Sequence, residues 1–259
     1  MYIEDLDHEV DVGIVFSLAA EQGCFEDLLS KVTRFDTAAG VVRSALLNDH
    51  TVVTIVSGAG GTAAASACKA ILAAHRPKLV ISAGFCGGLQ SSLKRNAITV
   101  ADRILSPTDA PLELDHPTLA NLQLAPALVG SWATVERIVS RAADKQSLGE
   151  RTGAVACEME SFAVAEVCAA RGVPCLAVRV VSDPVDEDLP NDLDPLMQSR
   201  STARLVGAVL GTLWRRPSSI KDLLRLKEQA LVAADALAKY LAGIVSQLPR
   251  TERLREENP

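Results

Sequence analysis

Short, uninterrupted apolar runs alternate with longer segments of helical periodicity along most of the chain. An apolar run without polar alternation is typical of a strand that is buried on both faces of a sheet. The expected strands are Val12–Phe16, Val41–Leu47, Thr51–Ser57, Lys78–Ala83, Ala97–Ala101, Ala154–Cys157 and Cys175–Val181. The expected helices are Ala19–Ser30, Gly61–His75, Thr134–Asp144 and Ser161–Arg171. This alternation predicts an α/β fold with a largely parallel or mixed sheet covered by helices on both faces.

Two regions depart from this alternation. The segment Leu105–Ala127 contains several prolines and little periodicity, so it predicts a long surface loop, and loops of this length are often functional. The C-terminal part is predicted to contain a helix over Leu193–Trp214, a long amphipathic helix over Ser218–Val245 and a charged, disordered tail over Pro249–Pro259. We therefore expect a single domain over residues 1–248, whose C-terminal part, residues 193–245, is helical.

Composition limits the partners of the protein. The chain has 259 residues, of which 48% are hydrophobic but only 3% aromatic, so its core must be built from Ala, Val, Leu and Ile. A formal net charge of -6 offers no basic surface for nucleic acid. The six cysteines show no CxxC spacing and lie in apolar segments, which indicates free thiols rather than a metal site. Neither a signal peptide nor an apolar run of ~18 residues is present, so a cytoplasmic protein is expected.

Acidic residues stand where two neighbouring strands are expected to end. Glu158 and Glu160 follow the strand Ala154–Cys157, and Ser182 and Asp183 follow the strand Cys175–Val181. In open parallel sheets, ligands bind in the crevice outside the carboxyl ends of the strands. These residues are therefore placed for chemistry. If Glu158 and Glu160 both lie on the following helix, their side chains point about 200° apart and only one faces the crevice.

Two glycine clusters also follow strands. The first, from Ser57 and Gly58 to Ala63, satisfies the loose dinucleotide pattern GxGxxA, but the next strand lacks the acidic residue that would bind a ribose hydroxyl. What remains is a turn whose backbone amides could approach a ligand at a helix N-terminus. The second cluster, from Ala83 through Gly84 to Leu89, is equally compatible with a tight turn.

Four motifs, taken in this order and spacing, resemble the nucleoside phosphorylase/hydrolase superfamily. They are the glycine turn at 57–61, AGFCGG at 83–88, CEMES at 157–161 and VVSDP at 180–184. The closest resemblance is to the 5'-methylthioadenosine/S-adenosylhomocysteine nucleosidases, over about Val12–Asp188. The resemblance implies a three-layer α/β/α sandwich with a mixed sheet, cleavage of a purine N-ribosidic bond, no metal, no organic cofactor and a homodimer.

The resemblance also implies roles for the matching residues. Glu160 would bind the ribose hydroxyls, and Met159 would pack against the sugar. Asp183, oriented by Ser182, would donate a proton to N7 of the purine, which requires a raised pKa. Glu21, in the segment GIVFSLAAE, would act as the general base toward water. We take Asp183 and Glu21 as the catalytic candidates.

The nucleophile is left open between water and phosphate. Phosphorylases of this superfamily bind phosphate through arginines near both glycine clusters, but this chain has no arginine before Arg34 and none in Ser82–Phe85. Water is therefore favoured, although Phe85 stands where the family usually has a small hydroxyl residue and would narrow the nucleophile site. A nucleoside-binding protein without catalysis is a third alternative, against which the three retained acids argue.

The substrate is less well defined by the sequence. Where the family stacks the base on an aromatic residue, this chain offers Ile138, with Trp132 nearby. The added C-terminal helices resemble those of the hopanoid-associated phosphorylase-like branch, whose substrate carries a large lipid, as in adenosylhopane. We therefore expect a small-molecule nucleoside as ligand, with a bulky apolar 5' substituent and contact with a membrane as the less favoured alternative.

Overall fold

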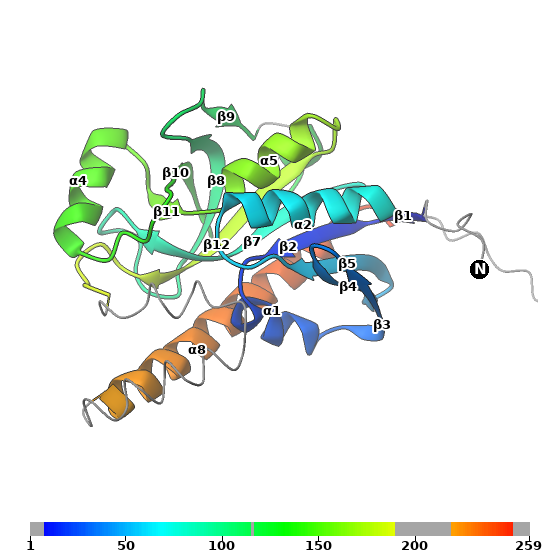
Figure 1. Ribbon diagram of the computed structural model, residues 1–259, viewed down its shortest axis with the longest axis horizontal. Coiled ribbons are helices and arrows are strands. Elements are labelled where there is room, and N and C mark those ends of the chain that lie inside the picture. Colours follow the sequence, from blue (N-terminus) through cyan, green and yellow to red (C-terminus); the bar gives the residue numbers. More distant parts are fainter. Residues whose placement is uncertain (1–7, 115–116, 190–218, 251–259) are drawn as a thin grey trace, which may run out of the picture.

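A computed structural model describes residues 8–114, 117–189 and 219–250, and Figure 1 shows their arrangement. Its main sheet runs in the order β11-β10-β8-β12-β7-β2-β5-β4-β3, and β9 pairs with β8. The strands are β1 (His8–Val10), β2 (Val12–Phe16), β3 (Ser30–Thr37), β4 (Gly40–Leu47), β5 (His50–Val56), β6 (His75–Pro77), β7 (Val80–Gly88), β8 (Ile98–Leu105), β9 (Leu112–Glu113), β10 (Leu128–Thr134), β11 (Ala156–Glu158) and β12 (Cys175–Asp183). Because parallel and antiparallel pairs both occur, the predicted mixed sheet is confirmed.

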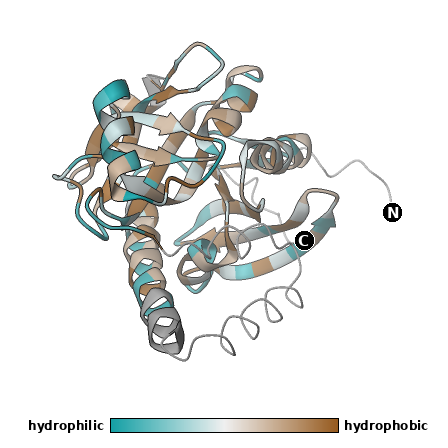
Figure 2. Ribbon diagram, turned by 60° about the vertical axis from the view of Figure 1, so that its left-hand side comes forward, coloured by the Kyte–Doolittle hydropathy of each residue, from teal (hydrophilic) through white to brown (hydrophobic). Residues whose placement is uncertain are grey.

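Helices cover both faces of this sheet and give it the three layers that were predicted. The helices are α1 (Ala19–Glu26), α2 (Gly61–Ala74), α3 (Pro117–Ala120), α4 (Ala142–Thr152), α5 (Ser161–Ala169) and α8 (Ser219–Val245). The pair α2 and α5 lies on one face, and the pair α1 and α8 lies on the other (Figure 1). Figure 2 shows hydrophobic residues along the central strands, with hydrophilic ones on the outer helix α4.

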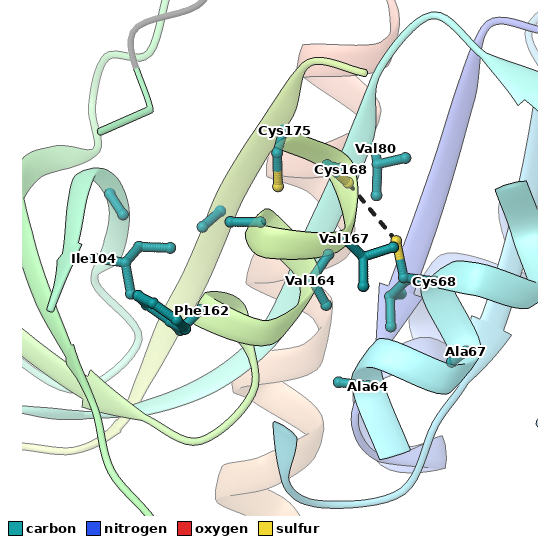
Figure 3. Packing of buried hydrophobic residues seen from close by; sticks show 14 of the residues in the cluster. Ala64, Ala67, Cys68, Val80, Ile104, Phe162, Val164, Val167, Cys168 and Cys175 are labelled. Atoms are coloured by element: carbon teal, nitrogen blue, oxygen red, sulfur yellow. Dashed lines mark hydrogen bonds between the residues drawn. The ribbon is translucent and has the colours of Figure 1, made fainter. Parts of the chain in front are cut away.

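Small side chains let α2 and α5 pack closely. Figure 3 shows Ala64 and Cys68 of α2 facing Val164, Val167 and Cys168 of α5. The sulfur atoms of Cys68 and Cys168 lie 3.7 Å apart, and all six cysteines are free thiols. The prediction of buried, unpaired thiols is confirmed for five of them, while Cys24 is partly exposed.

The long C-terminal helix α8 belongs to the core. Leu237, Leu241 and Ile244 are almost completely buried against the central strands, as the amphipathic pattern predicts. Leu231 on the same helix is half-exposed. No helix within residues 8–114, 117–189 and 219–250 is long and apolar enough to cross a membrane. The predictions for Leu193–Trp214 and for residues 251–259 lie outside the described residues.

One half of the sheet closes on itself, because the edge strand β11 also pairs with β7, in the middle of the strand order. Strand β7 pairs in parallel with β2 and β12, and its last residues, Gly87 and Gly88, also pair with Cys157 and Ala156 of β11 in antiparallel fashion. The strand Lys78–Ala83 was therefore predicted too short, because the glycine cluster continues the strand instead of forming a tight turn. As a result, the ends of β7, β11 and β12 converge on one point.

Two other sequence predictions were wrong. The segment Thr134–Asp144 is not a helix, since it holds the end of β10 and a connection to α4, which begins at Ala142. The start of this segment belongs to β10 because β10 pairs with both β8 and β11. Such pairing between strands distant in sequence leaves little signal in the local sequence. The expected loop Leu105–Ala127 contains the short strand β9 and the short helix α3.

Candidate active site

A cavity of about 520 Å³ lies where β2, β7, β11 and β12 end. Glu21, Glu160 and Asp183 all line it, although they come from α1, the start of α5 and the end of β12. The three carboxyl groups are therefore brought together around one space, which the strand ends predicted for Glu160 and Asp183 and the family resemblance predicted for Glu21. Each is at least nine-tenths buried, which makes its ionisation sensitive to its neighbours.

Glu21 lies in the first turn of α1, and backbone amides surround its carboxyl group. One oxygen accepts hydrogen bonds from the amides of Ser17 and Leu18, at 2.9 and 2.8 Å, and the other accepts one from the amide of Phe85, at 2.9 Å. Burial raises the pKa of Glu21 to about 7, and the Arg179 charge and these amides only partly oppose the rise. A carboxyl group with this pKa can both hold and release a proton near neutrality, as a general base must.

The approach of Glu21 explains a glycine in the middle of β7. A Cβ atom at Gly84 would lie 2.8 Å from the Glu21 carboxylate. At Gly87 of the same strand, a Cβ atom would lie 3.2 Å from Oδ2 of Asp183. The glycines of the AGFCGG segment thus leave room for two of the acids, instead of forming the tight turn that was expected.

Glu158 is a structural acid. Its carboxylate accepts from the amides of Glu160 and Ser161 at the start of α5 and from the Arg179 guanidinium at 2.9 Å. The side chains of Glu158 and Arg179 have no exposed area, and Arg179 also stacks over the ring of Trp132, 5.8 Å from its centroid. This pair stabilises the turn that carries Glu160, in the way a carboxylate caps a helix N-terminus.

Glu160 faces the cavity from the N-cap position of α5. Its Oε1 accepts from the amide of Gly60 at 2.7 Å, and its Oε2 lies 3.7 Å from the Arg179 guanidinium. Burial and the charge of Glu158 raise the pKa of Glu160, while Arg179 opposes them. Glu158 and Glu160 both precede the helix, so the condition under which helical geometry would separate their side chains is not met, although both residues contribute to the cavity lining. Only the Glu160 side chain retains exposed area, about 8%.

Asp183 ends β12 and is held by two side chains. Ser182 donates to its Oδ1 at 2.6 Å, and the ammonium group of Lys145 donates to its Oδ2 at 2.9 Å. Burial raises the pKa of Asp183, against the opposing effects of the Lys145 charge and the Ser182 hydrogen bond. The carboxyl group is therefore displaced toward its protonated form, which is the direction that proton donation requires.

The other predicted residues divide into two groups. Phe85, Ile138, Met159 and Ser182 line the cavity. Ser57, Gly58 and Gly84 are absent from its lining. The first glycine turn reaches the site indirectly, because its Gly60 amide binds Glu160.

Three cations near the site were not predicted. Arg179 was detectable in principle as a charged residue inside an apolar strand, whereas Lys145 lies on a helix that the periodicity placed elsewhere. Arg95 is the cation among the described lining residues, and it donates to the carbonyl of Ser182 and forms an ion pair with Glu187. The described part of the cavity therefore offers no unpaired cation to a phosphate ion.

Potential metal ligands are spread apart among the described residues. Their His, Cys, Asp and Glu side chains form no group of three or more that could hold a metal ion. The acids of the cavity are instead engaged by backbone amides, Lys145 and Arg179. What the arrangement can supply is a proton acceptor, a proton donor and a carboxylate acceptor for hydroxyl groups around one ligand.

Comparison with known proteins places these observations in a family. A family model described as the phosphorylase superfamily matches residues 12–212. The 5'-methylthioadenosine/S-adenosylhomocysteine nucleosidase of Haemophilus influenzae (strain PittEE) is 28% identical over 196 residues, covering 66% of this chain and 85% of that protein. The protein of the same name from Actinobacillus succinogenes is 29% identical over 203 residues, covering 68% of this chain and 86% of that protein.

Solved structures agree on the fold. The 5'-methylthioadenosine/S-adenosylhomocysteine nucleosidase of Helicobacter pylori superimposes with a TM-score of 0.70 at 20% identity, covering 93% of this chain and 99% of that one. The futalosine hydrolase of the same organism gives a TM-score of 0.69 at 19% identity, covering 93% and 98%. Proteins with different named substrates thus share this architecture, so the substrate must be argued from the site.

Proposed function

Because this chain belongs to the phosphorylase superfamily, we propose that it hydrolyses the N-ribosidic bond of a 5'-modified purine nucleoside and releases adenine. The substrate would be of the methylthioadenosine or S-adenosylhomocysteine type, as the names of its relatives suggest. The observation that carries the proposal is the meeting of Glu21, Glu160 and Asp183 in one cavity.

Each acid has a separate task in this reaction. Glu160 accepts hydrogen bonds from the 2' and 3' hydroxyls of the ribose, and its negative charge favours the positive charge that develops at the anomeric carbon. Met159, next to it in the lining, packs against the sugar. The Glu160 carboxylate is already fixed by the Gly60 amide, so little reorganisation is needed when the ribose binds.

Proton transfers at the two ends of the bond complete the reaction. Asp183 donates its proton to N7, which makes the purine a better leaving group as the bond between C1' and N9 breaks. Glu21 takes a proton from the water molecule whose oxygen bonds to C1'. The products are the free base and a free sugar hydroxyl at C1', and the proton gained by Glu21 balances the one lost by Asp183.

The surroundings of Glu21 favour water over phosphate. The Phe85 amide and the space beside Gly84 are occupied by the Glu21 carboxyl group, and a phosphate dianion there would meet its negative charge without a free cation from the described lining. Phosphorolysis of a purine nucleoside remains the alternative, and its variant with a bulky apolar 5' substituent depends on residues 193–214, outside the described residues.

We also propose a cytoplasmic homodimer. Half-exposed apolar side chains occur on two helices in contact with each other and at the end of one of them: Leu231 and Val232 on α8, and Leu28 directly after α1. Such side chains on neighbouring elements are typical of a surface that a second copy covers. Sedimentation equilibrium tests this, because a monomer at micromolar concentration would contradict it.

Adenine release tests the activity itself. The purified protein is incubated with methylthioadenosine and with S-adenosylhomocysteine, each with and without inorganic phosphate, and the base is measured by chromatography. We expect release at a rate that phosphate does not change. A rate that requires phosphate would favour the phosphorylase, and no release from either compound or from a wider nucleoside panel would favour a binding protein.

A further inference from the structure

Lys145 is a buried charge behind the site whose function the proposed reaction has not used. It lies on α4 with no exposed side-chain area, and it is absent from the cavity lining. Its ammonium group donates to Oδ2 of Asp183 at 2.9 Å and to the carbonyl oxygen of Pro184 at 2.7 Å. Lys145 thus holds both Asp183, which ends β12, and Pro184, which follows it.

Burying the ammonium group of Lys145 costs free energy, because the charge is removed from water. An apolar side chain of similar length would fill the same space without removing an ammonium group from water. Lys145 is the buried residue of α4, whose other residues are partly buried or exposed, so this helix places a charged side chain, and not an apolar one, against the sheet. The Lys145 side chain also packs beside Gly87, since its Cδ lies 3.7 Å from the position that a Cβ atom of Gly87 would occupy.

The charge of Lys145 acts on one form of Asp183. A protonated carboxyl group gains little from an adjacent ammonium group, whereas a carboxylate forms a strong, charge-assisted hydrogen bond with it. The other groups that act on Asp183 come from several elements: the Ser182 hydroxyl, the Arg95 guanidinium, and the Cys86 and Cys157 thiols. Lys145 is the cation in direct contact with its carboxyl group.

We propose that Lys145 is a positioning residue for departure of the base: its ammonium group fixes Oδ2 of Asp183 and stabilises the carboxylate that remains after the proton has passed to N7. The inference rests on the proposed function. Burial raises the pKa of Asp183 and so favours its protonated form, and Lys145 opposes this by stabilising the carboxylate that proton transfer leaves. The balance is simple, because the O–H bond of Asp183 breaks, the N7–H bond forms and Lys145 keeps its charge.

Replacement of Lys145 by methionine separates this role from mere packing. Lys145→Met retains the volume and removes the charge, so kcat for adenine release should fall about 10- to 100-fold, the factor expected for loss of a hydrogen bond to a charged group. The pKa of Asp183 should rise further, because a group that lowers it is gone. The limb of the pH profile of kcat/KM on which activity falls as Asp183 loses its proton should therefore move to higher pH.

Two further variants complete the test. Lys145→Arg keeps the charge and should restore part of kcat without the displaced limb. Lys239→Met, at a lysine whose side chain is 73% exposed on α8, should leave both kcat and the profile unchanged. A purely structural role for Lys145 would lower the folded fraction of Lys145→Met but move no limb of the profile, and that result overturns the proposal.

A double variant covers the case in which Lys145→Met does not fold. In Asp183→Asn/Lys145→Met, no charged partner is left unpaired, and the second change should add less than about twofold to the loss caused by Asp183→Asn alone. An additional tenfold loss would show that Lys145 does not act through Asp183. If the wild-type protein itself releases no adenine, the proposed function fails and this inference with it. An active wild type beside an unchanged Lys145→Met overturns the inference alone.

Discussion

Replacement of Glu21 by glutamine should change how the stability of the protein depends on pH. Burial raises the pKa of Glu21 from 4.5 to about 7. A group whose pKa is raised in the folded state contributes stability below its unfolded pKa and loses that contribution as pH rises through its folded pKa. The wild type should therefore lose stability between pH 4.5 and about 7 through this residue. In Glu21→Gln the side chain at this position does not titrate, so it should cause no such loss of stability.

The size of the effect follows from the displacement of the pKa. One pKa unit corresponds to about 1.4 kcal/mol, so the free energy of unfolding of the wild type, relative to that of Glu21→Gln, should fall by about 2 to 3 kcal/mol from pH 5 to pH 8. The variant also alters the hydrogen bonds with Ser17, Leu18 and Phe85, which shifts its free energy of unfolding by an amount that does not depend on pH. The change of the difference with pH therefore reports the titration of Glu21.

Urea unfolding of both proteins at several pH values measures this difference. Glu166→Gln on the exposed side of α5 is the matched control, and its difference from the wild type should stay within about 0.5 kcal/mol across the range. A Glu21→Gln difference as flat as that of the control would mean that Glu21 ionises in the folded protein as it does in water. Burial would then not prepare Glu21 as a general base.

Three further predictions concern the supporting structure. Glu160→Gln should lower kcat/KM roughly 10- to 100-fold in the adenine release assay, because glutamine can still bind the Gly60 amide but offers the ribose no charged acceptor; unchanged kinetics would contradict the role. Arg179→Met should destabilise the protein by about 3 to 5 kcal/mol in thermal or urea unfolding, since it leaves buried carboxylates without their cation, and a loss below about 1 kcal/mol would refute this. Leu241→Ala should cost about 2 to 5 kcal/mol and Glu228→Ala, exposed on the same helix, less than about 0.5, and equal costs would contradict the placement of α8.

The sequence was most informative where a residue follows a buried strand. Glu160 and Asp183 could be predicted to share a crevice because parallel strands bring their carboxyl ends to one edge of the sheet, and an apolar run marks such a strand clearly. Glu21 could be added only through the family motifs, since a glutamate in the first turn of a helix is otherwise explained by the helix dipole.

Other features depended on contacts that have no local signal. Lys145 meets Asp183 across 38 positions in sequence, from a helix that the periodicity misplaced. The glycines of AGFCGG were expected in a turn because glycine favours turns, but the approach of the Glu21 and Asp183 carboxyl groups is what requires them in a strand. Pairing of β7 with β11, which closes the site, is likewise set by the whole sheet.

The origin of the oxygen atom that bonds to C1' distinguishes attack by water from attack by phosphate. Methylthioadenosine is cleaved in oxygen-18 labelled water with inorganic phosphate present, and the sugar product is analysed by mass spectrometry after a single turnover. If the three carboxyl groups direct water onto the anomeric carbon, the product is free methylthioribose with one labelled oxygen at C1'. A sugar 1-phosphate without label at that position, or no cleavage, would show that Glu21, Glu160 and Asp183 do not direct hydrolysis.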